Sequence, residues 1–585
     1  MNKIIEHNAE ICVIGGGLAG MCAAISAARK NRKVVLIHDR PMLGGNCSSE
    51  VRMWVCGARG KNRRETGILE EIMLENAHCN SELIYPMWDA VLYSSVHSEK
   101  NIELLLNCSV NDAETDGEHI VSVSGWQLTT YKTHRVKAKI FIDCSGDSIL
   151  AELTGAEYRH GREAKEEYGE EAAPNIPDSK TMGNSILFQP KETDHPVPFI
   201  APPFARKFNS EEEFRHRNYD PKNPHNNFWW LELGGEKNTI DDAEEIRDDL
   251  LALAYGTWDY AKNKSQNKSD NWELDFMGWL PGKRESRRYV GRHTLTQPEV
   301  QAGGLFDDTI AYGGWQIDDH PPAGFEYDGP PNKNYPCPSP FGIPYGCLYS
   351  KNIDNLMFAG RNISVTHAAM AASRVMATCA LLGQAAGTAA ALAVGKNTDP
   401  DGVSIYIREL QEQLMYDDCW LPRFRRTVSE LCLSSELLVD GIKSDKAEAL
   451  RNGIDRPTDE EGDNGFFLPL ESSVSYRLPS SSYVEEVRII FDSDLDRTTT
   501  EGGTPGLPGK STLCCRPLNF RPVSFPKTMI RSFEIKADGK TIFTTDCNYQ
   551  RLNIISVKKE VSVIELIPHA TYGSEDAHIF SFDFR

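Results

Sequence analysis

The hydrophobic pattern changes along the chain and divides it into regions of different character. Residues 11–14 and 34–37 are uninterrupted apolar runs, and a glycine turn and a stretch of small residues lie between them. This is the pattern of a strand, a tight turn, a helix and a second strand, so we predict an α/β domain at the start of the chain. Apolar runs at residues 140–142 and 356–358 also lead into small-residue turns, and they predict further strands of this domain.

Other patterns separate the remaining regions. Residues 102–142 alternate apolar and polar positions around Asp116-Gly117, which predicts a β-meander inserted into the first domain. The next region is rich in Trp, Pro, Asn and Asp, and from Val428 onward short alternating segments predict the strands of a β-sandwich. We therefore expect a Rossmann-like domain in two parts, at residues 1–160 and 351–427. An α+β substrate domain is inserted at residues 161–350, and an all-β sandwich follows at residues 428–585.

The first glycine turn has the spacing that binds a dinucleotide. It reads GGGLAG, a GxGxxG sequence between a strand and a helix. Gly15 permits the tight turn, Gly17 lets a pyrophosphate approach the backbone, and Gly20 lets the helix pack closely on the sheet. The acidic residue that usually binds the ribose falls at His38, with Asp39 beside it. Either Asp39 binds the ribose hydroxyls or His38 makes a weaker contact.

A second glycine pair follows the second strand. After Arg40 the chain reads PMLGGNCSSEVRMW, in which Gly44 and Gly45 precede Asn46 and Cys47. This wording resembles the FAD-dependent oxidoreductases of the two-dinucleotide-binding-domain superfamily, in which such a Gly-Gly pair passes close to the flavin. The resemblance implies that FAD binds noncovalently in an extended pose.

Two later motifs extend the resemblance. The strand at 140–142 leads into DCSGD, which resembles the second flavoprotein motif, and residues 355–362 resemble the third. In related flavoproteins the following helix, here at 377–394, points its positive N-terminus at the flavin pyrimidine, where it stabilises negative charge on the reduced flavin. The residues that the resemblance implies for FAD binding are Gly15, Gly17, Leu18, Ala19, Gly20, His38, Asp39, Arg40, Gly44, Gly45, Asn46, Cys47, Val110 (near the adenine), Cys144, Ser145, Gly146, Asp147, Gly360, Arg361, Thr378 and Ala385.

Four residues are candidates for catalysis. His367 lies between two flavin-facing motifs, and we expect it to act as a general base while hydride passes to flavin N5. Arg374 is expected to hold an anionic or polar substrate group, or a flavin carbonyl. Within the inserted region, GKRESRR and AYGGWQID resemble motifs of the same subgroup. A dense cluster of Arg and Glu is costly to bury unless it is paired, so Arg284 and Arg287 are candidates for orienting the substrate.

Two groups of residues leave alternatives open. Arg52, Arg59, Arg63 and Arg64 form either a solvated face or a clamp for a carboxylate or for FAD phosphate. The aromatic residues of the insertion either build its core or cover the flavin.

Composition narrows the partners and the location. The net charge of −21 and the pI near 5.3 argue against a nucleic-acid partner. The fifteen cysteines are scattered singly apart from Cys514-Cys515, with no metal-binding spacing, so we expect reduced thiols and no metal. The stretch at 377–394 is interrupted by Gly383, Gln384 and Gly387, which indicates a buried helix rather than a membrane span. With no signal segment in the sequence, we expect a cytoplasmic protein.

These observations predict an FAD-dependent oxidoreductase that acts on a polar small molecule. A carbohydrate or a sugar acid is the expected substrate, because the predicted sandwich resembles galactose-binding-like jelly rolls and sugars stack on aromatic faces. Two alternatives stay open: elimination or epimerisation through transient oxidation, and a carbohydrate-binding protein with a degenerate flavin domain. A second GxGxxG sequence that opens a βαβ unit is absent from the sequence, so a quinone, a protein carrier and oxygen all stay open as electron acceptor.

Overall fold

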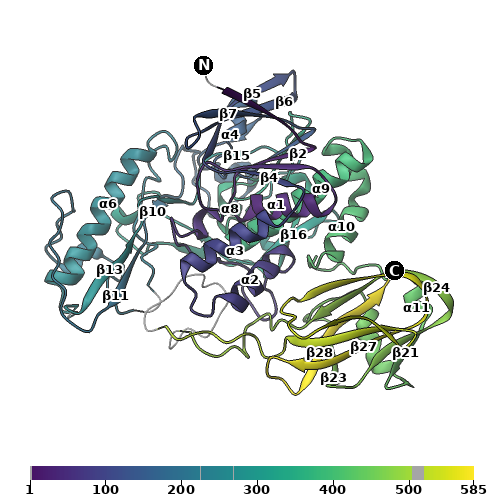
Figure 1. Cartoon of the computed structure of the whole chain (residues 1–585). Coiled ribbons are helices and arrows are strands. Elements are labelled where there is room, and N and C mark those ends of the chain that lie inside the picture. Colours follow the sequence, from purple (N-terminus) through teal and green to yellow (C-terminus); the bar gives the residue numbers. More distant parts are fainter. Residues whose placement is uncertain (1–2, 224–225, 268, 504–519) are drawn as a thin grey trace.

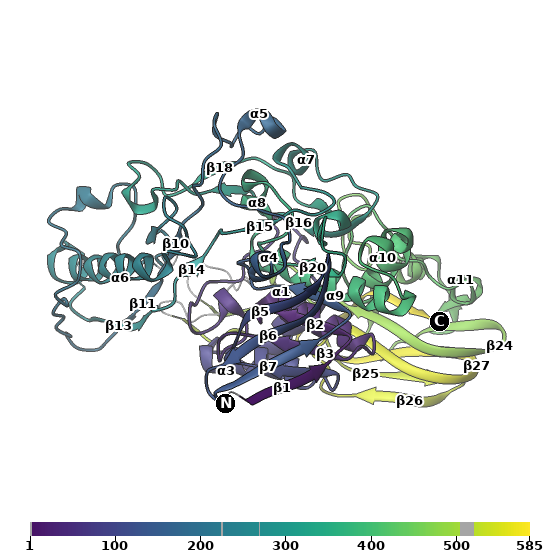
Figure 2. The same cartoon turned by 90° about the horizontal axis from the view of Figure 1, so that it is seen from above.

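The computed structural model describes residues 3–223, 226–267, 269–503 and 520–585. Figure 1 shows a central α/β part, an insertion that contains the helix α6 (Ala243–Asp259), and a β-sandwich formed by the C-terminal strands. In Figure 2 the insertion and the sandwich lie on opposite sides of the central part. The predicted fold class is confirmed.

The central sheet has five parallel strands, in the order β20, β8, β2, β3, β4. Every residue of the first four of these strands is buried. Strands that are covered on both faces need apolar runs without alternation, which is what the sequence supplies. Because the strands are parallel, the motifs that follow them meet at the carboxyl edge of the sheet. The strands are β20 (Leu356–Phe358), β8 (Ile140–Asp143), β2 (Ile11–Ile14), β3 (Val34–Ile37) and β4 (Ile102–Leu105).

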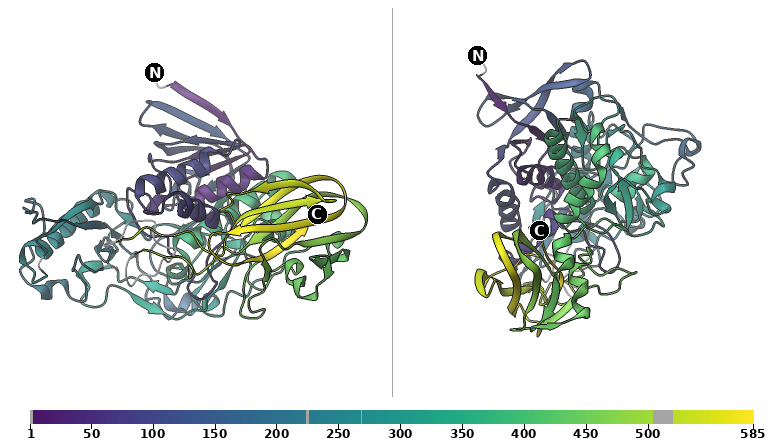
Figure 3. Two further views of the ribbon diagram at one scale, coloured as in Figure 1. Left: turned by 60° about the horizontal axis from the view of Figure 1, so that its bottom comes forward. Right: turned by 90° about the vertical axis from the view of Figure 1, so that its right-hand side faces the viewer.

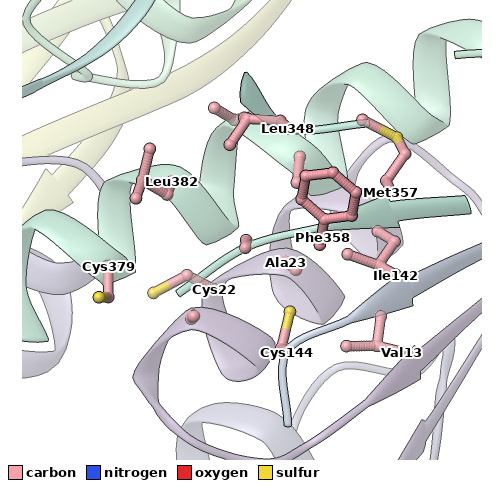
Figure 4. Packing of buried hydrophobic residues seen from close by; sticks show 14 of the residues in the cluster. Val13, Cys22, Ala23, Ile142, Cys144, Leu348, Met357, Phe358, Cys379 and Leu382 are labelled. Atoms are coloured by element: carbon pink, nitrogen blue, oxygen red, sulfur yellow. The ribbon is translucent and has the colours of Figure 1, made fainter. Parts of the chain in front are cut away.

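Two helices with small residues pack against each other on this sheet. They are α1 (Leu18–Arg29) and α9 (Met376–Lys396). A Cβ atom at Gly383 would lie 2.0 Å from the carbonyl oxygen of Ala19, and one at Gly387 would lie 2.1 Å from that of Ala23. The contacts advance by one turn on both helices together, so the helices run in the same direction and their N-termini face the same edge. Figure 4 shows Cys22, Cys379 and Leu382 from this contact, with Val13 and Ile142 of the sheet to their right.

This contact predicts the effect of adding a single methyl group. We expect Gly383→Ala to lower the free energy of unfolding by about 1–3 kcal/mol, because the new carbon meets rigid backbone. Gly395→Ala in the same helix is the matched control: there the nearest atom is the mobile tip of Arg32, so alanine should be neutral or stabilise by about 0.5–1 kcal/mol. Chemical denaturation of both variants measures the difference, and equal stability would contradict the close helix contact.

A second sheet corrects the predicted meander. Its order is β1, β7, β6, β5, and β1 pairs in parallel with β7. The turn at Asp116-Gly117 is present, but residues 102–105 and 140–143 pair with the parallel sheet instead. The polar segment before residue 11, which predicted no element, forms the edge strand β1. Figure 3 shows this sheet where the N-terminus lies. Its strands are β1 (Lys3–Asn8), β5 (Cys108–Asp116), β6 (His119–Gln127) and β7 (Lys132–Lys137).

The insertion has its own hydrophobic core, which α6 covers. Phe228, Trp230, Trp258 and Trp272 belong to this core, whereas Trp229 is only partly buried. Residues 289–358 that follow pack largely into the core of the central part. The short strands are β9 (Tyr158–Arg159), β10 (Asn184–Ser185), β11 (Phe188–Glu192), β12 (Glu232–Leu233), β13 (Trp272–Met277), β14 (Gly282–Lys283), β15 (Arg288–Tyr289), β16 (Thr309–Gly313), β17 (Ile317–Asp319), β18 (Lys333–Tyr335) and β19 (Phe341–Pro344).

The C-terminal strands form the predicted sandwich, but two of them are long. One of them, β24 (Val474–Phe491), joins two of the short alternating segments, 474–478 and 487–491, because irregular pairing carries the chain across the exposed polar residues between them. The strands are β21 (Glu436–Val439), β22 (Ile442–Lys443), β23 (Phe466–Pro469), β24 (Val474–Phe491), β25 (Ile530–Ala537), β26 (Lys540–Thr545), β27 (Leu552–Thr571) and β28 (Asp576–Phe584).

The remaining helices are short or lie at the surface of the central part: α2 (Ile68–Cys79), α3 (Tyr85–His97), α4 (Ile149–Thr154), α5 (Lys165–Tyr168), α7 (Gln297–Gln301), α8 (His367–Ser373), α10 (Ile407–Tyr416) and α11 (Glu430–Ser434). Among the described residues, α9 alone is long and apolar enough to cross a membrane, and 94% of its apolar window is buried inside the protein. The described cysteines are free and mostly buried, and Cys514 and Cys515 lie outside the described residues.

Candidate active site

The two glycine turns lie side by side at the N-terminus of α1. Gly44 donates its N–H to the carbonyl of Gly16 (2.8 Å). At Gly15, which has φ of +101°, a Cβ atom would meet the carbonyl oxygen of Cys144 at 2.4 Å. At Gly17 the nearest atom would be the Cα of Gly45, at 4.0 Å. The backbone is therefore tight at Gly15, and there is room for a group to approach it at Gly17.

The N-terminus of α1 carries no competing acid. Gly17 is its N-cap residue, no side chain caps it, and its first turn contains no acidic residue. The N-terminus of a helix attracts anions through its N–H groups and its dipole. With the space at Gly17, these features form an anion-binding cradle of the kind that a pyrophosphate requires.

His38 and Asp39 follow β3 and lie side by side, with His38 Nδ1 3.2 Å from Asp39 Oδ1. His38 is buried, its Nδ1 accepts from the N–H of Gly16 (3.0 Å), and its Nε2 lies 2.9 Å from the carbonyl oxygen of Met42. The side chain of Asp39 is 57% exposed. His38 therefore holds the two glycine turns together, and Asp39 presents the exposed carboxylate. Cys108 N–H bonds the carbonyl of His38 (2.8 Å), so β5, which contains Val110, begins beside this point.

The turn after β8 forms a charged cluster. Asp147 accepts from Lys283 Nζ, Arg361 Nη2 and Ser286 Oγ, each at 2.8 Å. Burial opposes ionisation of Asp147, but the charges of Arg361 and Lys283 outweigh it and hold its pKa below the usual range. Arg361 Nε is buried without a partner among the described residues. The sequence placed Asp147 and Arg361 in one site, and the structure brings them into contact.

His367 lies at the start of α8 between two carboxylates. Its Nδ1 is 2.8 Å from Glu285 Oε2 and its Nε2 is 3.2 Å from Asp319 Oδ1, and the ring is almost completely buried. Burial lowers the pKa of His367, but the charge of Glu285 and the hydrogen bond to Asp319 outweigh it and raise the pKa to about 10. At neutral pH the ring is an imidazolium that donates from both nitrogens. Because a general base must be unprotonated, His367 has to lose its proton before it can act in this role, and the general base stays a prediction.

A second network of charged side chains lies beside His367. Arg374 Nη2 is 3.0 Å from the carbonyl oxygen of Asp318, and the Asp318 carboxylate faces His320 at 3.4 Å. His320 in turn binds Glu232 (2.7 Å), which faces Arg284 (3.3 Å). Burial raises the pKa of Asp318, but the hydrogen bond and charge of His320 and the charge of Arg374 outweigh it and lower the pKa below its usual range. Arg284 and Arg374, two separately predicted candidates for catalysis, thus lie at the two ends of one network.

Several residues of these networks were not predicted. Asp318 is the last residue of AYGGWQID, Asp319 and His320 follow it directly, and Glu285 lies inside GKRESRR. Consecutive acids at the end of β17 point to opposite sides of a strand, so one meets His320 and the other meets His367. The sequence signal was the run Asp-Asp-His itself.

Arg287 lies elsewhere. Its guanidinium binds Glu152 of α4 (2.7 Å) and lies over the ring of Tyr158. The structure therefore does not bring Arg287 together with Arg284: successive side chains of this segment leave in different directions, and Arg287 faces α4.

The four arginines after the glycine pair form neither a solvated face nor a single clamp. Arg52 binds Gln189 of the insertion (2.9 Å), and Arg59 binds Gln316 (2.7 Å). Arg63 pairs with Asp459 of the C-terminal region, and Arg64 binds Glu70 of α2 (2.8 Å). Arg52, Arg59, Arg63 and Arg64 therefore each connect this stretch to a different part of the molecule.

The sequence model of the family described as FAD dependent oxidoreductase matches residues 10–414, which is more than half of the chain. The chain belongs to this family. It is an FAD-dependent oxidoreductase, and the cradle at α1, the uncapped N-terminus of α9 and the Asp147–Arg361 cluster fit FAD.

Individual relatives resemble this FAD-dependent oxidoreductase only in part. Soluble pyridine nucleotide transhydrogenase of Marinobacter nauticus is 49% identical over 43 residues, which cover 7% of this chain and 9% of the relative. A geranylgeranyl bacteriochlorophyll reductase-like protein of Thermoplasma acidophilum covers 71% of this chain and 86% of its own, at 12% identity and a TM-score of 0.32. The family 32 carbohydrate-binding module of Streptococcus pneumoniae EndoD covers 27% of this chain and 99% of its own, at 13% identity and a TM-score of 0.19. The chain thus spans less than a tenth of the curated relative's length.

The N-terminus of α9 has the features that an anionic group of the flavin requires. Val375 is its N-cap residue, with no capping side chain and no acid in the first turn. Thr378, however, does not offer its hydroxyl to the cofactor, because the hydroxyl donates to Glu65 Oε1 (3.2 Å). Ala385 lies about two turns further in and is buried.

Proposed function

We propose that this FAD-dependent oxidoreductase transfers a hydride between a hydroxyl-bearing carbon of a polar small molecule and flavin N5. The observation that carries the proposal is His367, an imidazolium held between Glu285 and Asp319 at the start of α8, the short helix that precedes α9. Oxidation of an alcohol releases a proton together with the hydride, so such a site needs a group that handles the proton.

His367 and Asp319 supply this proton chemistry. When bound, FAD supplies the hydride acceptor. Asp319 is the more exposed of the two carboxylates, with 16% of its side chain accessible, and its bond to His367 is the longer one. A substrate hydroxyl that replaces this bond meets a carboxylate that takes its proton and an imidazolium N–H that stabilises its oxygen. In the reverse direction the same pair returns the proton.

The charges of the site favour an uncharged substrate. Arg284 faces Glu232, Arg374 faces Asp318, and His367 faces two carboxylates, so each of these cations already has an anionic partner. Trp229 is partly buried, and its ring meets that of His320 edge-on at 5.4 Å between centroids. A polyhydroxylated ring uses both features, because its hydroxyls bond the charged groups and its C–H face packs on an aromatic surface. Between the two expected classes, a neutral carbohydrate is therefore preferred to a sugar acid.

We expect neutral sugars to bleach the flavin absorbance of the purified holoenzyme under anaerobic conditions, and the matching sugar acids to react more slowly. The measurement follows absorbance near 450 nm after mixing with each member of a sugar and sugar-acid panel. Faster bleaching by the acids would contradict the charge argument, and no bleaching by any hydroxylated compound would contradict the proposed function.

Product analysis then separates oxidation from a redox-neutral reaction. A net oxidation consumes an external electron acceptor in equal amount to the product. Elimination or epimerisation proceeds without it, and that outcome would replace the proposed net reaction.

A further inference from the structure

A buried glutamate lies at the N-terminus of α9 and comes from a distant segment. Glu65 ends the stretch from Gly57, and its Oε1 accepts from the N–H of Ala58 (2.9 Å) and the hydroxyl of Thr378 (3.2 Å). The carbonyl of Cys56 accepts from Ala377 N–H (2.9 Å). Residues 57–66, which we call the bracing segment, therefore lie directly against the first turn of α9.

The C-terminal region holds the bracing segment. Arg456 is buried, with Nη1 3.0 Å from the carbonyl oxygen of Arg64 and Nη2 2.7 Å from Thr66 Oγ1. Asp496 accepts from the N–H of Asn62 (2.9 Å). A buried guanidinium bonded to backbone and hydroxyl oxygens is geometrically specific, and its removal leaves those oxygens unpaired.

A network of ion pairs extends this contact to α2. Glu70 is buried and binds both Arg64 (2.8 Å) and Arg497 of the C-terminal region (2.8 Å). Burial alone raises the pKa of Glu70, but the charges of Arg497 and Arg64 outweigh it and lower the pKa to about 2. Glu70 thus stays ionised and ties the residue before Glu65 to the sandwich across the whole working pH range.

Glu65 itself titrates near neutrality. Burial raises the pKa of Glu65 to about 7, although hydrogen bonds and Arg64 favour its ionised form. Among the described residues, Cys56, Cys379 of α9 and Tyr312 of β16 also couple to Glu65, and burial raises the pKa of each. These three stay uncharged at neutral pH, so a change in charge here is a change at Glu65.

We propose that the C-terminal β-sandwich completes the flavin site: it fixes the bracing segment so that Glu65, a positioning and tuning residue, controls how strongly the N-terminus of α9 favours reduced FAD. An ionised Glu65 offsets the positive end of the helix and opposes an anionic reduced flavin. A protonated Glu65 leaves the helix end effective. Reduction should therefore become harder as the pH rises through about 7.

Redox titration of the FAD-loaded full chain tests the proposal without any substrate. At pH 8 we expect Glu65→Gln to raise the equilibrium constant for flavin reduction about tenfold over the wild type, and at pH 6 to change it little. The wild type should show an additional pH dependence near 7 that the variant lacks. Equal pH dependence in both proteins would overturn the role of Glu65.

Arginine variants test the role of the sandwich. Arg456→Met should release the bracing segment, and the pH dependence near 7 should shrink or move. Arg488→Met is the matched control, because Arg488 is equally buried but binds Asp455 (2.7 Å) and the carbonyl oxygens of Tyr416 (2.8 Å) and Met415 (3.1 Å), none of which belongs to the bracing segment. The control should retain the wild-type redox behaviour.

If Arg456→Met does not fold, Arg456→Lys keeps the charge but cannot reach both oxygens, and the same measurement applies to it. Identical redox titrations for the Arg456 variant and the Arg488 control would overturn the proposal. Because the readout is flavin reduction by a chemical reductant, failure of the proposed alcohol chemistry would leave this test unaffected.

Discussion

Gly17→Asp is expected to abolish retention of FAD while the protein stays folded. Gly17 has φ of −68° and ψ of 175°, which any L-residue adopts, and the nearest atom to an added Cβ is 4.0 Å away. Aspartate is also a preferred N-cap residue, so its carboxylate would bond the first N–H groups of α1. The same carboxylate occupies the position of the pyrophosphate and repels it. The substitution thus satisfies the helix and excludes the cofactor.

The ratio of flavin to protein absorbance after purification measures this effect, and a thermal melt checks folding. Gly17→Ala is the control, since a methyl group fits the same space without charge and should retain much of the FAD. Normal flavin content in Gly17→Asp would show that the pyrophosphate does not bind at this turn.

His367→Ala is expected to keep FAD but to slow flavin reduction by substrate by about two to four orders of magnitude, the usual range for a lost acid or base. The loss has two parts: the imidazolium no longer stabilises the substrate oxygen, and Asp319 loses the partner that fixes its orientation. Glu285 keeps Arg288 and the N–H of Met182 as partners, so its charge stays compensated.

Anaerobic stopped-flow reduction of the purified variant gives the rate, and its flavin content gives the cofactor occupancy. Arg287→Gln is the control, because Arg287 faces α4 and its loss should leave reduction nearly unchanged. An unchanged rate in His367→Ala would assign the histidine to structure alone.

The protonated state of His367 also affects stability, and the sign follows from its pKa. The folded pKa of about 10 lies above the ordinary value of 6.5, so the stabilisation is complete below pH 6.5 and is lost as the pH rises toward 10. Any stability difference between wild type and His367→Ala that comes from this charge should therefore shrink between these pH values.

The sequence predicted the parts of the fold that depend on local pattern. The four apolar runs became buried parallel strands, and the small-residue helix became α9, because each signal is contained within a few neighbouring residues. The polar strand β1 was missed because its partner β7 lies more than a hundred residues away and its own side chains are mostly exposed. The sequence pattern of the long strand β24 indicates two short segments instead of one strand, because its middle is polar.

The site shows the same limit. The glycine turns and the Asp147–Arg361 contact follow from motifs, whereas Glu285 and Asp319 meet His367 across 82 and 48 residues of sequence. Glu65 meets Thr378 across 313 residues. Nothing local distinguishes such a carboxyl from a surface one, because its role depends on burial and on partners that only the folded chain brings together.

The parallel packing of α1 and α9 has an electrostatic consequence. Two helices that run side by side in the same direction place like partial charges next to each other at both ends, so their dipoles repel. A dinucleotide whose negative groups lie at both N-termini relieves this repulsion. The bound cofactor then stabilises the packing of the two helices in addition to taking part in the reaction. Its release should loosen the first turns of both helices together, and amide hydrogen exchange there should speed up while the far ends of the helices stay protected.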